Sequence, residues 1–266
     1  MSRAALALEH THHIERLVLL GTPNCGSFAA VQALRGTYAV VRKVARLAQQ
    51  TSAESLAAQV FNTFPSLYEL LPWGACRVDG GDLFDACSWP TGGPRPSATL
   101  LEAARASQGQ LAPPDERFAV IAGVGAETVT AVRRRGEEFL YTLTRGGDGT
   151  VPLVSALLPG VRSAFARAAH SDLTRNAVVA AAVVDLLRAG STRRLPSRWA
   201  SGARASAQVS DAQLRRTHAE KVEWAALTPQ ERRLFLENLN EPPHLRLRVP
   251  GGGAGRARAA GRRRRR

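Results

Sequence analysis

The sequence is poor in cysteine, and this excludes two common kinds of small scaffold. Its three cysteines, Cys25, Cys76 and Cys87, are too few for a framework of disulfides and too scattered for a zinc site. Cys76 and Cys87 flank a Gly80-Gly81 turn, where they could form one bridge in an oxidising compartment or stay as two inert thiols. The residues present imply neither a metal ion nor an organic cofactor.

Long apolar runs are also missing. No stretch approaches the roughly 18 apolar residues that are needed to cross a bilayer. Met1 leads directly into S-R-A-A-L-A-L-E, which is typical of a helix and not of a signal peptide. We therefore expect a soluble protein without a transmembrane segment, cytoplasmic by default unless the true N-terminus carries a signal peptide.

Lysine is almost absent, so the net charge of +14 is carried by arginine. Of the 36 basic residues only Lys43 and Lys221 are lysines. The last sixteen residues, Gly251–Arg266, hold seven arginines and no acid, and we expect residues 250–266 to form a disordered basic tail. Such a tail could neutralise phosphates, but a solvated low-complexity end has the same composition and no nucleic-acid-binding fold accompanies it. Nucleic acid is therefore not the partner we favour.

What the sequence does contain is enough apolar residues for a core, 44% of the chain, arranged in an α/β pattern. Residues 16–21 (R-L-V-L-L-G) and 117–125 (R-F-A-V-I-A-G-V-G) are short apolar runs of the kind buried in a parallel sheet. Residues 161–167 form a weaker strand candidate, and residues 172–188 an amphipathic helix. Two further runs, at 128–132 and 139–144, predict an antiparallel excursion.

The stretch between the two strongest strands, residues 28 to 110, is far longer than a usual crossover. Helical spacing of apolar residues predicts helices over 28–50 and 52–72, followed by an irregular Gly- and Pro-rich stretch. We interpret the block as an inserted helical cap.

The C-terminal part has a different character. Residues 191–209 are low in large apolar residues and predict a linker. Residues 210–249 predict a helical extension with two capping-box starts, at Ser210 and at Thr228.

Two residues carry the candidate chemistry: Asp148 in G-G-D-G-T-V-P and His170 in A-A-H-S-D-L. A carboxylate on a glycine loop, followed 22 positions later by a histidine before a helix, fits the second half of a Ser-Asp-His triad. There the carboxylate holds one imidazole nitrogen so that the other can move a proton. G-D-G is also a common turn, and a lone histidine before a helix is often only a cap or a surface group.

Five stretches in order resemble the lipase and acyltransferase branch of the α/β hydrolases typified by lecithin:cholesterol acyltransferase. They are R-L-V-L-L-G-T-P-N-C-G-S at 16–27, P-S-L-Y-E-L-L-P at 65–72, G-V-G-A-E-T at 123–128, G-D-G-T-V-P-L-V-S-A at 147–156 and H-S-D-L at 170–173. The resemblance implies that residues 1–190 form the C-terminal part of an α/β-hydrolase domain, a parallel sheet flanked by helices. It also implies that Asp148 is the triad acid, His170 the base, and residues 28–110 a lid over an acyl-binding cleft.

The sequence departs from this family at the nucleophile, because it contains no G-x-S-x-G. Ser2 is the nearest hydroxyl to the expected place, but it should lie on a helix and not at the sharp turn. Losing a triad serine typically costs about a million-fold in turnover. We therefore expect this chain alone to be inactive, as if truncated before the nucleophile. Its first sheet strand would then be an open edge that could bind a complementing upstream fragment.

The function that the resemblance implies is a serine-type ester hydrolase or O-acyltransferase acting on lipid-like esters. The residues expected to contact the acyl chain are Leu67, Tyr68, Leu70 and Leu71, although their spacing is equally that of side chains that stabilise a cap helix. The alternative, motivated by the absent serine, is a non-catalytic relic that binds a lipid or a partner.

Overall fold

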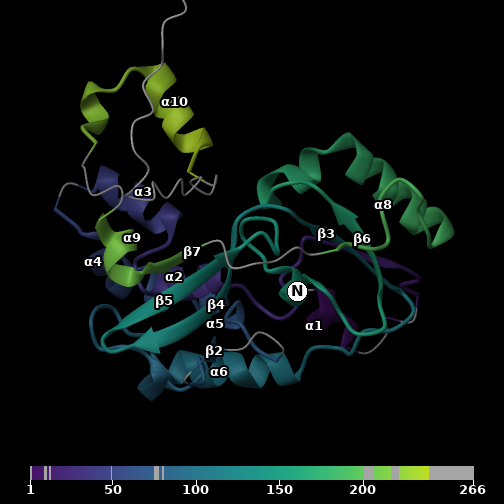
Figure 1. Ribbon diagram of the computed structural model, residues 1–266, viewed down its shortest axis with the longest axis horizontal. Helices are drawn as coiled ribbons and strands as arrows, with labels where there is room; N and C mark the ends of the chain where they lie inside the picture. The colour runs from purple at the N-terminus through teal and green to yellow at the C-terminus, as the bar shows by residue number, and fades with distance from the viewer. Residues whose placement is uncertain are drawn as a thin grey trace, which may run out of the picture.

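Three short strands form a parallel sheet in the computed structural model of this protein, which is a mixed α/β fold (Figure 1). The structure describes residues 2–8, 11, 13–48, 50–74, 78–79, 81–200, 207–216 and 222–239. The predicted tail at 250–266 and Cys76 lie outside these residues, and with Cys76 the choice between a bridge to Cys87 and two inert thiols. Within them, no helix combines the length and the apolar character needed to cross a membrane.

The parallel sheet has the order β1-β3-β6. Its strands are β1 (Leu17–Leu20), β3 (Phe118–Gly123) and β6 (Arg162–Ala166), which confirms the three sequence predictions. Every residue of the central strand β3 is buried, as expected for a strand covered on both faces.

Side-chain alternation along β3 divides the surroundings of this sheet into two cores. Val120 and Ala122 pack with Leu6 of α1 (Ser2–Leu6) and with Ala156 of α7 (Leu153–Ala156). On the other face, Ala119 and Ile121 pack against α8 (Ala177–Ala189), which lies across the sheet in Figure 1. Helices thus flank both faces of the sheet.

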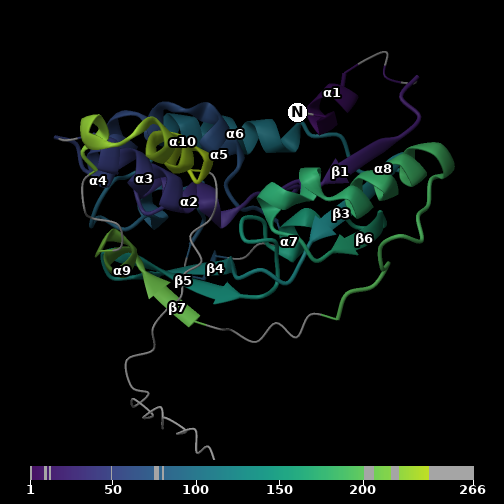
Figure 2. The same cartoon turned by 90° about the horizontal axis from the view of Figure 1, so that it is seen from above.

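Strand β1 is an edge strand. It pairs with β3 from Leu17–Phe118 to Leu20–Ile121, and no other described strand pairs with it. Figure 2 shows β1 at one edge of the sheet and β6 at the other, with β3 between them. An apolar edge with unpaired backbone groups is a template for another strand.

A second sheet has the order β2-β4-β5-β7. The predicted excursion is the hairpin of β4 (Thr128–Arg135) and β5 (Glu138–Thr144). Strand β2 (Val78–Asp79) pairs in parallel with β4, and β7 (Ala207–Ser210) pairs antiparallel with β5. The last residues of the predicted 191–209 linker therefore belong to this sheet, because Val209 is apolar and packs into its core.

The block between β1 and β3 is helical, but its first helix is not continuous over 28–50. Its helices are α2 (Phe28–Leu34), α3 (Ala39–Leu47), α4 (Ala53–Gln59), α5 (Pro65–Glu69) and α6 (Ala98–Gly109), with the short 3-10 helices η1 (Phe61–Thr63) and η2 (Ala86–Ser88). Gly36 breaks the expected helix with a φ of +69°, and a Cβ there would lie 2.8 Å from the Ala53 carbonyl oxygen. The apolar period continues across this turn, which is why sequence reasoning missed it.

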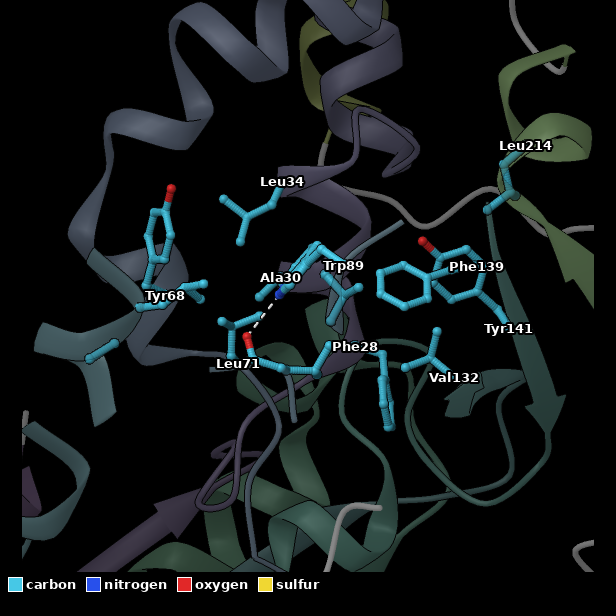
Figure 3. Packing of buried hydrophobic residues seen from close by; sticks show 14 of the residues in the cluster. Phe28, Ala30, Leu34, Tyr68, Leu71, Trp89, Val132, Phe139, Tyr141 and Leu214 are labelled. Carbon is cyan, nitrogen blue, oxygen red and sulfur yellow. Dashed lines mark hydrogen bonds between the residues drawn. The ribbon is translucent and has the colours of Figure 1, made fainter. Parts of the chain in front are cut away.

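A single apolar core joins this helical block to the second sheet. Trp89 lies edge-on to Phe139 with ring centroids 5.5 Å apart, and Phe28, Tyr68 and Leu71 are fully buried around them (Figure 3). The Trp89 indole N–H donates to the Leu83 carbonyl, so its polar atom is satisfied inside the core.

The C-terminal helices begin where the capping boxes predict. In α9 (Asp211–Arg216) the Ser210 N–H donates to the Gln213 side chain and the Gln213 N–H to Ser210 Oγ. Thr228 and Glu231 form the same reciprocal pair in α10 (Pro229–Glu237), which follows the short 3-10 helix η4 (Trp224–Ala226).

The helix predicted over 172–188 begins later than expected, at Ala177 in α8. Asn176 caps it by accepting from the Val178 and Val179 N–H groups. Residues His170–Arg175 form the 3-10 helix η3 in place of its first turns.

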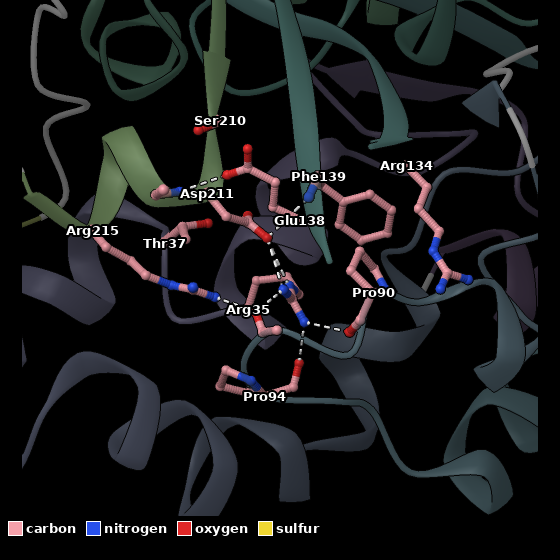
Figure 4. Close-up of polar contacts among 12 residues, drawn as sticks. Arg35, Thr37, Pro90, Pro94, Arg134, Glu138, Phe139, Ser210, Asp211 and Arg215 are labelled. Carbon is pink, nitrogen blue, oxygen red and sulfur yellow. Dashed lines mark hydrogen bonds and ion pairs between the residues drawn. The ribbon is translucent and has the colours of Figure 1, made fainter. Parts of the chain in front are cut away.

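A buried ion pair ties α9 to the helical block (Figure 4). The Arg35 guanidinium donates to the Asp211 carboxylate at 3.0 and 2.8 Å and to the carbonyls of Pro90, Gly92 and Pro94. Both side chains are 0% exposed. Asp211 also accepts from the Phe139 N–H and the Tyr141 hydroxyl, so neither charge is left unmatched.

Removing one partner of this pair should destabilise the fold strongly. We expect Arg35→Met to lower the free energy of unfolding by about 3–5 kcal/mol, because Asp211 would stay buried without its counter-charge. Urea unfolding followed by tryptophan fluorescence measures this. The matched control is Arg105→Met, which removes the exposed pair with Asp82 and should cost about 0–1 kcal/mol. Equal costs for the two variants would contradict this role for Arg35.

Candidate functional site

The two residues singled out from the sequence lie side by side at the carboxyl end of the parallel sheet. His170 Nδ1 is 2.8 Å from Asp148 Oδ2, and the His170 backbone N–H donates to the Asp148 carbonyl at 2.9 Å. Asp148 is 1% exposed, whereas the His170 side chain is 39% exposed. The structure thus forms a buried acid that holds an accessible imidazole.

The loop between β5 and α7 holds the Asp148 carboxylate. Its Oδ1 accepts from the Thr150 N–H at 3.0 Å and from the Val151 N–H at 2.7 Å, and Oδ2 is left for the imidazole. Gly149 supplies the positive φ, +96°, that the tight turn requires. The G-D-G-T-V sequence therefore aims one carboxylate oxygen at His170 while its own backbone satisfies the other.

This hydrogen bond sets the electrostatics of the imidazole. The bond to Asp148 raises the pKa of His170 above its ordinary value of 6.5, and partial burial opposes this rise. When His170 is neutral, its Nδ1 proton faces the carboxylate, so Nε2 carries the free lone pair. Among the described residues no hydrogen-bond partner meets Nε2.

Glycines end two of the three strands and leave room for the pair. A Cβ on Gly21, directly after β1, would lie 3.4 Å from both His170 Nδ1 and Asp148 Oδ2. A Cβ on Gly123, the last residue of β3, would lie 2.6 Å from the Asp148 Cβ. A Cβ at Gly123 would therefore collide with Asp148, and a Cβ at Gly21 would lie 2.6 Å from Leu173 Cδ1 and in contact with both members of the pair.

The loop after β1 packs on the Asp148 loop. The Asn24 side chain donates to the Ala156 carbonyl at 2.7 Å, and Ser27 Oγ donates to the Thr150 carbonyl. The Ser27 N–H in turn donates to the Leu70 carbonyl at 2.8 Å. Three of the sequence stretches, 16–27, 65–72 and 147–156, are therefore joined by hydrogen bonds next to the loop that carries Asp148.

The four residues expected to contact an acyl chain fall into different environments. Tyr68 and Leu71 are fully buried in the core of the helical block, and the Tyr68 hydroxyl donates to the Asn62 carbonyl at 2.7 Å. Leu67 is partly buried, and Leu70 is 39% exposed. Of the four, Leu70 presents the most accessible apolar surface, and its carbonyl is the one bonded to Ser27.

Sequence reasoning missed two polar residues beside the acid. Tyr38 immediately precedes α3, and burial raises the pKa of its hydroxyl. Thr128, the first residue of β4, bonds to the backbone of Gly149. Its position in G-V-G-A-E-T was a signal that could have drawn attention to it.

No alternative nucleophile or metal centre emerges from the described residues. Ser2 lies within α1, as expected. Burial raises the pKa of the Cys25 thiol, so it is not an activated thiolate. In the described part of the chain no group of three or more His, Cys, Asp or Glu side chains could hold a metal ion.

Comparisons of this chain with protein-family models, with curated proteins and with solved structures found no match. The site must therefore be interpreted from its own geometry.

Replacing Asp148 by Asn should lower the pKa of His170 toward its ordinary value, because the amide carries no negative charge to favour the imidazolium. NMR titration of the imidazole measures this. The control is Asp172→Asn, which removes an exposed carboxylate two residues away and should leave the titration unchanged. A His170 pKa that is the same in wild type and Asp148→Asn would contradict the assigned contact.

The same contact predicts how stability depends on pH. Because the pKa of folded His170 is raised, its stabilising contribution should be fully present below the unfolded value, about 6.5. This stabilising contribution should disappear as the pH rises through the pKa of His170 in the folded protein.

Proposed function

We propose that this chain carries the acid and the base of a hydrolase or O-acyltransferase that uses a hydroxyl nucleophile on ester substrates. The observation behind the proposal is the Asp148–His170 pair, with a buried carboxylate on Nδ1 and an accessible Nε2. A histidine that only caps a helix or covers a surface does not need a dedicated buried acid.

The chemistry would follow from the geometry of the imidazole. Nε2 takes the proton from an attacking hydroxyl as its oxygen bonds to the ester carbonyl carbon, and Asp148 stabilises the imidazolium that forms. The imidazolium then returns that proton to the departing alkoxide as the carbon–oxygen bond breaks. Water or an alcohol repeats the cycle on the acyl intermediate, which gives hydrolysis or transfer.

In this proposal the nucleophile belongs to a segment that pairs with the open edge of β1. Gly21, directly after β1, already lies against the acid–base pair. A strand added in parallel at this edge would end beside Gly21, on the same side of the sheet as His170. The absence of G-x-S-x-G from the sequence agrees with a nucleophile supplied from outside the described residues.

A lipid-like ester is the proposed substrate, with the helical block as the cap that receives it. Val60, Phe64 and Leu70 are each at least 39% exposed and flank the short helix α5. Leu70 is linked to the loop that carries Asp148 through Ser27, and an exposed apolar side chain there fits a substrate with a hydrocarbon part.

The alternative function is a non-catalytic protein that retains an apolar binding surface. The unpartnered Nε2 favours it, since a base without a nucleophile performs no acyl transfer. Binding of nucleic acid depends on the arginine-rich tail, which lies outside the described residues, and stays the less favoured proposal.

A fluorophosphonate probe, which labels activated serines, separates the two functions. We expect no labelling of the 266-residue chain, and labelling when the reading frame is extended upstream of the Met1 codon. His170→Ala should abolish the labelling, whereas His13→Ala should not. Absence of labelling in every extended product would favour the non-catalytic alternative, and strong labelling of the 266-residue chain would contradict the proposed origin of the nucleophile.

Substitutions in and around α5 test the proposed substrate. Phe64→Ser and Leu70→Ser should reduce the preference for long over short p-nitrophenyl esters in the active form, with little change in melting temperature, because both side chains are exposed. Leu71→Ala is the control: it should lower the free energy of unfolding by about 2–5 kcal/mol, since Leu71 is fully buried. An unchanged chain-length preference in both serine variants would contradict this surface.

A further inference from the structure

We propose that Thr128 is a positioning residue for the acid–base pair, and that its hydroxyl holds the peptide group between Asp148 and Gly149 in the orientation that His170 requires. Thr128 Oγ1 accepts from the Gly149 N–H at 2.8 Å and donates to the Ala126 carbonyl at 3.0 Å. The residue is 1% exposed, so water cannot replace either bond without reorganisation.

One rigid peptide group links Thr128 to His170. Its carbonyl oxygen belongs to Asp148 and accepts from the His170 backbone N–H at 2.9 Å, while its N–H belongs to Gly149 and donates to Thr128. A peptide group is planar, and its C=O and N–H point in opposite directions. Thr128 and His170 therefore bind opposite sides of the same peptide group. Rotation of that peptide group would change the positions of both Asp148 and His170.

Glycine residues on both sides of Asp148 make this restraint necessary. Gly147 and Gly149 leave the backbone free to rotate, and the φ of Gly149 is +96°. The loop therefore needs bonds from outside to adopt a single orientation. Thr128 supplies one of them from the start of β4.

The methyl group of Thr128 has a separate role. A Cβ on Gly147 would lie 2.8 Å from Thr128 Cγ2 and 2.7 Å from Oγ1, so the loop backbone passes directly over the threonine side chain. Valine would preserve this shape but could not accept from Gly149. Serine would keep the hydroxyl and lose only the methyl group.

The base of the hairpin helps to hold the same loop. Thr128 and Thr144 are paired in the β4–β5 register, and Thr144 Oγ1 accepts from the Gly146 N–H at 2.9 Å. The Ala126 N–H donates to the Gly147 carbonyl. The start of β4 and the end of β5 thus both hold the loop that carries Asp148. The same hairpin also forms the middle of the second sheet.

The test is an NMR titration of the His170 imidazole in the 266-residue chain, which needs no nucleophile and no turnover. We expect Thr128→Val to shift the pKa toward 6.5 and Thr128→Ser to keep the wild-type value. Thr142→Val is the control on the same hairpin, because Thr142 is paired with Ala131 and Gln208 and not with Thr128, and it should leave the titration unchanged. Thr128→Val with a lower melting temperature but an unchanged titration would show a merely structural role and overturn the proposal.

A second measurement applies if Thr128→Val does not fold. In the wild-type protein the Gly149 amide should exchange with solvent at least about tenfold more slowly than exposed loop amides, since it is bonded to a buried oxygen. Exchange at the rate of exposed amides would overturn the proposal. The inference rests on the proposed function only in calling the pair catalytic. If no extended product is labelled by the fluorophosphonate, the proposed function is contradicted, but the effect of Thr128 on the His170 titration is tested independently.

Discussion

The Asp148 carboxylate is almost completely removed from water, and a polar group in that position requires hydrogen bonds in place of its lost hydration. Two backbone N–H groups of its own turn satisfy one oxygen, and the His170 imidazole satisfies the other. This requirement explains why the surrounding loop is rich in glycine and why no bulky residue follows β1 or ends β3. The first sheet positions the pair, and the second sheet holds the loop that carries the acid.

Apolar packing joins the helical block to the second sheet, and one buried ion pair joins it to α9. These two interactions have different physical roles. The apolar core around Trp89 and Phe139 contains buried side chains from both the helical block and the second sheet. Arg35 and Asp211 contribute specificity, because a charge buried there is tolerable only when its partner is in place. Helix α9, which follows the predicted linker, is thereby part of the fold and not a separate appendage.

Gly21 directly follows the edge strand β1 and also lies against the Asp148–His170 pair. The accessible Nε2 and the unpaired edge of β1 are therefore on the same side of the molecule. In the proposed function, His170 is a base that still needs a hydroxyl partner, and the apolar edge of β1 is where a further strand could pair. One added strand with a serine at its end would complete both. This coincidence is why we favour an ester-processing function over a binding relic.

The sequence alone predicted the three strands of the parallel sheet and the β4–β5 hairpin, and it singled out Asp148 and His170. Apolar runs at 16–21 and 117–125, turn glycines and capping residues are local signals, and each is written in a few consecutive residues. Only the tertiary structure decided which polar groups surround Asp148, that Tyr68 and Leu71 face the core while Leu70 is open, and that residues 207–210 add a strand to the second sheet. The helix break at Gly36 was also decided by the tertiary structure. Glycine is necessary there because the Ala53 backbone, from another part of the chain, packs against it. Local propensity specifies elements, whereas contacts between distant residues depend on how those elements pack, and no short window of sequence contains that information.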